Sequence, residues 1–140
     1  MKKVISTKEA PAAVGPYSQA IRAGSMVFCA GQIPLDPQSG QIESQDVGEQ
    51  AKRVLENISG VLQAAQLNFS HVVKTTVLLT DLADFQTVNE IYASYFEDQP
   101  PARSTIQVSA LPKGAKVEIE AIAFAADGGS GDKTASDTSG

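Results

Sequence analysis

A long helical pattern followed closely by a β-branched segment is the feature that most constrains the fold of this chain. Between residues 46 and 66, apolar side chains recur at helical spacing and predict a helix with one buried face. Asp46 is expected to be its N-cap, with Glu49 three residues later. Residues 72–79 are mostly β-branched and apolar, which favours a central strand. The two patterns together predict a helix that packs on a sheet.

A second helix is expected to begin at Asp81 and to stop before Pro100 and Pro101, because proline cannot continue a helix. Its buried face is expected to hold the apolar side chains that recur at helical spacing, which are Phe85, Val88, Ile91, Tyr92, Tyr95 and Phe96. Further short strands are predicted at residues 4–7, 17–22, 26–30, 104–109 and 116–125. The predicted order is βββαβαββ, an α+β fold in which two helices cover one face of a mixed sheet.

The other face of this sheet is expected to be left open. In most strands the residues that face either side of the sheet are apolar, so the open face cannot be very polar. An exposed apolar face usually binds a partner, and we therefore expect oligomerisation. Residues 1–126 are expected to form a single domain. Residues 127–140 are rich in Gly, Ser, Asp and Thr and are expected to form a flexible tail that resembles an added linker.

Composition excludes several classes of function. The net charge of −5 argues against non-specific binding of nucleic acid, which needs a basic surface. The single cysteine, Cys29, cannot form an internal disulfide and is expected to be a small buried side chain. Because neither a signal-peptide pattern nor a long apolar run is found, the chain is expected to be cytoplasmic, with no membrane partner.

Two charged residues near the end of the chain suggest a binding site. Arg103 leads into one apolar segment, and Glu118 lies in the next, after a turn at residues 111–115. A guanidinium binds a planar carboxylate well, and a carboxylate can position or deprotonate water. The residues also allow plainer roles: a surface ion pair for Arg103, a solvated strand end for Glu118, and a cap on the core for Tyr17. His71 has no partner at ligand or triad spacing and is expected to be structural or exposed.

The segments 101–106, 111–113 and 117–121 resemble the signature of the RidA family, also called the YjgF family. The resemblance runs from Lys3 to about Phe124. It implies a chorismate-mutase-like fold and a homotrimer with sites between subunits. It also implies hydrolysis of imino and enamine acids, namely 2-aminoacrylate, 2-iminobutanoate and 2-iminopropanoate, to 2-keto acids and ammonia. The family needs no cofactor or metal and acts on intermediates released by pyridoxal-phosphate enzymes.

The resemblance also implies roles for single residues. Arg103 would hold the substrate carboxylate, Glu118 would hold or activate the attacking water, and Tyr17 would close the pocket. Substrate contacts are expected from Ala30, Gly31, Asn89 and Thr105. Two departures from the family pattern stand out. Thr105 replaces a cysteine found in some members, and Pro100 replaces an aromatic residue found in many.

If the last two strands paired as an antiparallel hairpin, Glu118 would lie level with about Ser109. Arg103 would then be roughly 20 Å away along the strand, at about 3.3 Å per residue. Arg103 of one subunit is therefore predicted to meet Glu118 of its neighbour. Two other functions stay open: a non-catalytic binding module that uses the same cleft, and a translation-inhibiting ribonuclease. The acidic net charge and the lack of a pair of histidines weigh against the ribonuclease.

Overall fold

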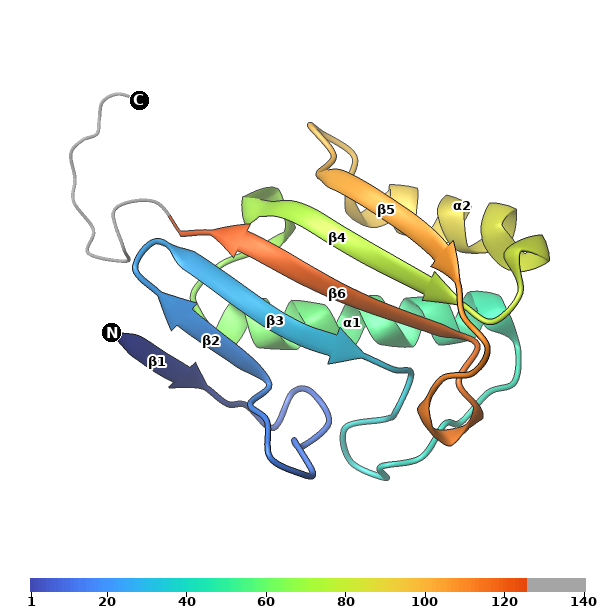
Figure 1. Cartoon of the computed structure of the whole chain (residues 1–140), viewed down its shortest axis with the longest axis horizontal. Helices are drawn as coiled ribbons and strands as arrows, with labels where there is room; N and C mark the ends of the chain where they lie inside the picture. Colours follow the sequence, from blue (N-terminus) through green and yellow to red (C-terminus); the bar gives the residue numbers. More distant parts are fainter. Residues whose placement is uncertain (126–140) are drawn as a thin grey trace.

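The computed structural model describes residues 1–125, and the predicted tail at 127–140 lies outside them. Figure 1 shows one twisted sheet with two helices behind it, which confirms the predicted α+β class and the order βββαβαββ. The elements are β1 (Lys2–Ile5), β2 (Ala20–Ala23), β3 (Met26–Gln32), α1 (Val47–Ala64), β4 (Val72–Leu79), α2 (Phe85–Tyr95), β5 (Ala102–Gln107) and β6 (Val117–Phe124).

The six strands lie in the order β1-β2-β3-β6-β4-β5. All pairs are antiparallel except β4 and β5, which are parallel and are joined through α2. The expected antiparallel hairpin of the last two strands is therefore wrong, because β4 lies between β5 and β6. A helical crossover returns the chain parallel to the strand it left, which places β5 on the free edge of β4.

Helix α1 forms where the apolar periodicity predicted it. The carboxylate of Asp46 accepts a hydrogen bond from the backbone N–H of Glu49 at 2.9 Å, so the predicted N-cap is confirmed. Val54, Leu55 and Ile58 of its apolar stripe are fully buried against the sheet, and Val47 at the start of the helix is partly buried. This burial is the main contribution of α1 to the core.

Helix α2 begins later than predicted. Asp81 caps a 3-10 turn at Leu82–Asp84, where it accepts from the N–H of Ala83 at 2.9 Å, and the α-helix starts only at Phe85. Val88, Tyr92 and Phe96 are buried, and Ile91 and Tyr95 are partly buried. The expectation that Phe85 is buried is wrong: it is 37% exposed, because it lies at the first turn of the helix beside the outer edge strand.

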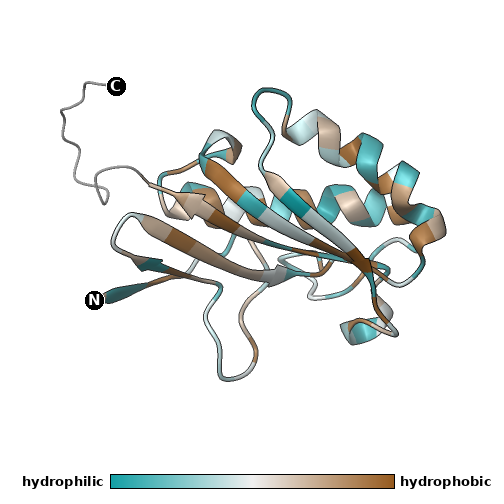
Figure 2. Cartoon of the chain, turned by 45° about the horizontal axis from the view of Figure 1, so that its top comes forward, coloured by the Kyte–Doolittle hydropathy of each residue, from teal (hydrophilic) through white to brown (hydrophobic). Residues whose placement is uncertain are grey.

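The face of the sheet turned away from the helices is open and partly apolar. It carries Val4, Phe28, Ile106 and Phe124, each between 44% and 59% exposed. In Figure 2, hydrophobic segments are found along the strands of the sheet as well as along the helices. The expectation of an open face that is not very polar is confirmed. Within residues 1–125, no helix has the length and hydropathy needed to cross a membrane.

The cap of α1 gives a test of the fold. Replacing Asp46 with alanine should lower the free energy of unfolding by about 1 kcal/mol, because one N-terminal N–H loses its acceptor. Asp84 stands at the same position of α2 but makes no side-chain cap bond, so Asp84→Ala should change stability by less than about 0.5 kcal/mol. Urea unfolding of both variants measures the difference, and equal losses would contradict the assigned cap.

Candidate functional site

The first candidate site is a cavity of about 430 Å³, which we call the Glu118 hollow. It lies where the loop before β2, the end of β3, the turn before β6 and the start of β6 meet. Its polar and charged walls come from Tyr17, Gln19, Gln32, Lys113 and Glu118, and Gly31 forms part of its floor. Prolines and aliphatic side chains form the remaining wall. A small acid with an apolar side chain suits such a lining.

Gly31 leaves the space that Glu118 occupies. A Cβ built at Gly31 would collide with the carboxylate Oε2 and would lie 2.9 Å from Cδ of Glu118. The register of β3 against β6 shifts between Cys29 and Gln32, so Gly31 lies in an irregular stretch of the ladder. The lack of a side chain at this position therefore sets where the carboxylate lies.

Burial raises the pKa of Glu118, and the neighbouring carboxylate of Glu120 raises it further. Both side chains project from the open face of β6, whereas Val117 and Ile119 point into the core. A half-buried carboxylate with an elevated pKa is better suited to accept a proton near neutral pH than an ordinary glutamate. The alternative of two fully solvated carboxylates does not hold for Glu118.

Tyr17 and Lys113 line the rim of the Glu118 hollow. Tyr17 is 55% exposed, so its phenol is presented to a ligand rather than packed into the core. Lys113 lies in a 3-10 turn with φ of 58°, in the left-handed region that is unfavourable for residues other than glycine. The turn places a lysine cation on the wall of a cavity that also holds a carboxylate.

The second candidate site is a cavity of about 390 Å³ between α2 and the start of β5, which we call the Arg103 hollow. Arg103 Nη1 donates a hydrogen bond to Asn89 Oδ1 at 2.8 Å. The guanidinium also lies over the rings of Tyr92 and Phe85. Pro100 and Pro101 form the far wall, so the double proline that follows α2 shapes this cavity.

Arg103 and Glu118 do not meet within one chain. Arg103 pairs with Thr75 of β4, and Glu118 pairs with Leu78, so about 10 Å of strand separates them rather than the roughly 20 Å expected from a hairpin. The side chain of Thr75 is buried under the helices, whereas the side chain of Leu78 points to the opposite, open face of the sheet. The two charged groups therefore leave the sheet on opposite faces.

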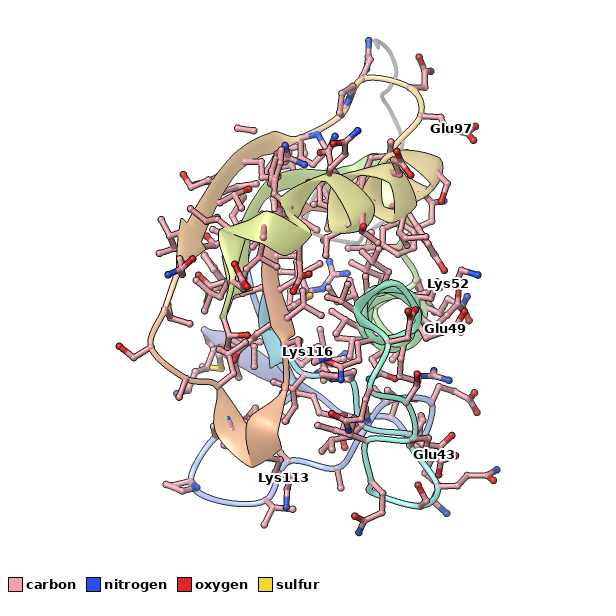
Figure 3. The ribbon with its side chains drawn as sticks, turned by 90° about the vertical axis from the view of Figure 1, so that its right-hand side faces the viewer. Glu43, Glu49, Lys52, Glu97, Lys113 and Lys116 are labelled. Carbon is pink, nitrogen blue, oxygen red and sulfur yellow. The ribbon has the colours of Figure 1, made fainter. Side chains whose placement is uncertain are left out.

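Figure 3 labels a residue of the turn before β6 and a residue of the loop after α2, at opposite ends of the view. Lys113, in the turn before β6, lies at the bottom of the view, and Glu97, in the loop between α2 and β5, lies at the top. Of the residues predicted from sequence, Tyr17, Gly31 and Glu118 line the Glu118 hollow, and Asn89 and Arg103 line the Arg103 hollow. Ala30 precedes Gly31 in β3, and Thr105 lies on the same face of β5 as Arg103, but neither lines a hollow.

Lys113, Phe85 and Tyr92 are site residues to which the sequence gives no role at a site. The sequence predicts Lys113 in a turn and in a signature segment, and it predicts Phe85 and Tyr92 on the buried face of a helix. The signal for the rings was available, because Phe85, Asn89 and Tyr92 follow each other at spacings of four and three and so share one side of α2. What was missing was the parallel placement of β5, which brings Arg103 to that side.

Two residues considered from the sequence take structural roles. Burial raises the pKa of the Cys29 thiol to about 12, so it carries almost no thiolate at neutral pH. His71 Nδ1 accepts a hydrogen bond from the N–H of Asn68 at 3.1 Å and helps to close a short capping box. Among residues 1–125, no three His, Cys, Asp or Glu side chains cluster as metal ligands would.

Comparisons with known proteins agree with this architecture. Residues 7–125 match the family described as endoribonuclease L-PSP. The chain is 55% identical over 123 residues to 2-iminobutanoate/2-iminopropanoate deaminase of Mus musculus. The aligned residues cover 88% of this chain and 91% of that protein. A protein of the conserved Rid family from Yersinia pestis has a crystal structure with a TM-score of 0.86 and 49% identity, covering 89% and 99% of the two chains. E. coli TdcF with bound serine gives a TM-score of 0.83 and 50% identity, covering 87% and 98%.

The coupling between the two carboxylates of β6 can be tested directly. Glu120→Gln should lower the pKa of Glu118, because it removes one of the two causes that raise it, while burial, the larger cause, remains. A pH titration of the Glu118 carboxyl carbon by NMR measures the change. The exposed Glu97, in the loop after α2, provides the matched control Glu97→Gln, which should leave the titration unchanged. A Glu118 titration unaltered by Glu120→Gln would show that the two carboxylates do not interact.

Proposed function

Because this chain belongs to the endoribonuclease L-PSP family, also known as the RidA/YjgF family, we propose that it is an enzyme that deaminates reactive imino acids. Its substrates are 2-aminoacrylate, 2-iminobutanoate and 2-iminopropanoate, and its products are 2-keto acids and ammonia. The observation that carries the proposal is 55% identity, over nearly the whole domain, to a protein named for this reaction. The two hollows supply the groups that the reaction needs.

The enamine 2-aminoacrylate first takes up a proton from water at C3 and becomes the protonated form of 2-iminopropanoate. The reaction then consumes one water for each imine. The water oxygen attacks C2 of the imino acid, the π electrons of the C=N bond move to nitrogen, and the water gives up a proton. The resulting amino alcohol loses ammonia as its hydroxyl becomes the ketone of the 2-keto acid. Because a protonated imine is already electrophilic at C2, the protein has to place substrate and water rather than supply a strong nucleophile.

Glu118 acts as the general base in this scheme. Its carboxylate accepts the proton from the attacking water and returns it to the nitrogen that leaves. The raised pKa of Glu118 suits both steps, because a carboxyl that titrates closer to neutral pH serves as base and then as acid. Gly31 leaves this carboxylate free to face the hollow.

Arg103 binds the carboxylate that all of these substrates share. Two parallel hydrogen bonds from its guanidinium fix the plane of a 2-imino acid and so its reacting carbon. Tyr17 closes the hollow over the substrate, and the backbone at Ala30, Gly31 and Thr105 provides further contacts. Thr105 can act only through its backbone or its hydroxyl. Asn89 contributes through its bond to Arg103.

The working site is proposed to form between subunits of a homotrimer. Arg103 and Glu118 leave opposite faces of the sheet, so one copy of the chain cannot bring them to one substrate. The open apolar face provides the surface on which a second copy would pack. A cyclic trimer would place the Arg103 hollow of each subunit against the Glu118 hollow of the next.

The proposed setting follows from the chemistry of the substrates. Such imines and enamines are released by pyridoxal-phosphate enzymes that eliminate water from hydroxyamino acids, so this chain would act after them. No cofactor takes part in the proposed steps. A cytoplasmic location stays a prediction of the sequence.

The family description also names an endoribonuclease activity, which makes ribonuclease the second candidate. The chain has one histidine, which caps a turn, and a net charge of −5, so it lacks the usual groups for RNA binding and cleavage. Incubation with a mixed-sequence RNA should leave the RNA intact. Cleavage that Glu118→Gln abolishes would favour the ribonuclease instead.

Deaminase activity can be measured by coupling this protein to a threonine dehydratase and trapping the remaining imine with semicarbazide. The wild-type chain should sharply reduce the trapped imine, and Arg103→Ala should lower kcat/KM by roughly 10- to 100-fold, because a charged hydrogen-bonding partner of the substrate is lost. Arg53→Ala, on α1 and outside both hollows, is the matched control and should behave as wild type.

Two outcomes of this assay would count against the proposal. Equal rates for wild type and Arg103→Ala would exclude the assigned role of Arg103 in deamination. A wild-type chain that binds 2-ketobutanoate but never accelerates imine loss would favour the non-catalytic binding module.

Assembly through the open face gives a separate prediction. Phe28→Asp places a charge in the middle of the apolar surface and should convert the trimer to monomers with loss of activity. Leu82→Asp, at a residue of similar exposure in the turn before α2, should leave both unchanged. Light scattering after size-exclusion chromatography measures the mass, and a trimeric, active Phe28→Asp would contradict the assigned interface.

A further inference from the structure

Arg103 is held by the faces of two aromatic rings and by one amide. Its guanidinium carbon lies 4.8 Å from the ring centre of Tyr92 and 5.4 Å from that of Phe85. Its Nη1 donates to Asn89 Oδ1 at 2.8 Å. Within residues 1–125, no carboxylate forms a salt bridge with Arg103. All three partners come from α2, so a single helix determines the setting of this side chain.

The ring of Tyr92 is itself fixed from behind. Its hydroxyl and Thr75 Oγ1 share a hydrogen bond of 2.6 Å, and both residues are buried. The same ring lies 4.5 Å from the ring of Phe96. Thr75 is also the residue of β4 that pairs with Arg103 in the parallel ladder. One strand position therefore fixes both the backbone of Arg103 and the ring under its guanidinium.

Rings and a single amide leave most donors of a guanidinium without a hydrogen-bond acceptor. A cation–π contact is an attraction between the positive charge and the face of the ring, and Asn89 accepts from only one of the five N–H groups. A carboxylate partner would neutralise the positive charge and occupy the donor pairs that a ligand needs. Rings and a neutral amide restrict rotation while the charge stays available. Burial raises the pKa of Tyr92, so its hydroxyl stays neutral in this contact.

We propose that Phe85 and Tyr92 are positioning residues for Arg103: with Asn89 they hold its guanidinium in the orientation that receives the substrate carboxylate. This inference rests on the proposed deaminase function. It gives Phe85 a reason to be exposed at the start of α2, where a buried apolar side chain would be expected. It also gives the bond between Thr75 and Tyr92 a role in substrate binding.

Kinetics of ring variants test the proposal. Tyr92→Leu and Phe85→Leu should each raise KM about fivefold and change kcat by less than about twofold, the size expected for loss of one cation–π contact that acts on ground-state binding. Tyr92→Phe keeps the ring and loses only the hydroxyl, so it should recover most of the affinity lost in Tyr92→Leu. If Tyr92→Leu does not fold, Phe85→Leu still decides, because Phe85 is exposed.

A spectroscopic readout separates this proposal from the proposed function. The Nε–H resonance of Arg103, assigned by its loss in Arg103→Ala, should show an upfield ring-current shift that persists in Tyr92→Phe and shrinks in both leucine variants. An unshifted resonance in the wild type would overturn the proposal, as would an unchanged KM in both leucine variants while Arg103→Ala raises it. If Arg103→Ala deaminates normally, the proposed function fails, and the resonance alone decides whether the rings hold Arg103.

Discussion

The two ladders of β4 are the constraint on which the rest of the structure depends. One ladder runs parallel to β5 and aligns Thr75 with Arg103, and the other runs antiparallel to β6 and aligns Leu78 with Glu118. The two positions on β4 are three residues apart. Since side chains alternate along a strand, an odd separation sends the guanidinium to the helix side and the carboxylate to the open side.

This arrangement divides the chemistry of the chain into two incomplete halves. The Arg103 hollow has a cation held by rings and an amide, and no carboxylate is paired with it within residues 1–125. The Glu118 hollow has a half-buried carboxylate that lies where a Cβ at position 31 would be, so a side chain in place of Gly31 would displace it. Each half is well ordered by its own surroundings, but neither can both bind and hydrolyse a small imino acid. The proposed assembly over the open apolar face would unite them.

Much of this could be predicted from the sequence, because it depends on local patterns. The apolar spacing predicted α1, the β-branched run gave the bounds of β4, and the RidA signature pointed to Arg103 and Glu118. The register of the last two strands could not be read from local patterns, because it depends on which strand accepts β5 as its neighbour. A strand, a helix and a strand in succession favour a parallel pair, and this rule would have placed β5 beside β4. Without that placement, the contact of Arg103 with Phe85 and Tyr92 could not be foreseen.

The central claim is that the arginine and the glutamate of one active site come from different copies of the chain, and mixed oligomers test it most directly. Arg103→Ala and Glu118→Gln should each keep at most about a tenth of the wild-type deaminase activity alone, in line with the loss of a charged hydrogen-bonding group. Co-expressed in equal amounts, they should form trimers in which about a quarter of the clefts combine an intact Arg103 with an intact Glu118, and about a quarter of the wild-type deaminase activity should return. A mixture as inactive as its two components, with mixed trimers verified by mass, would contradict the account.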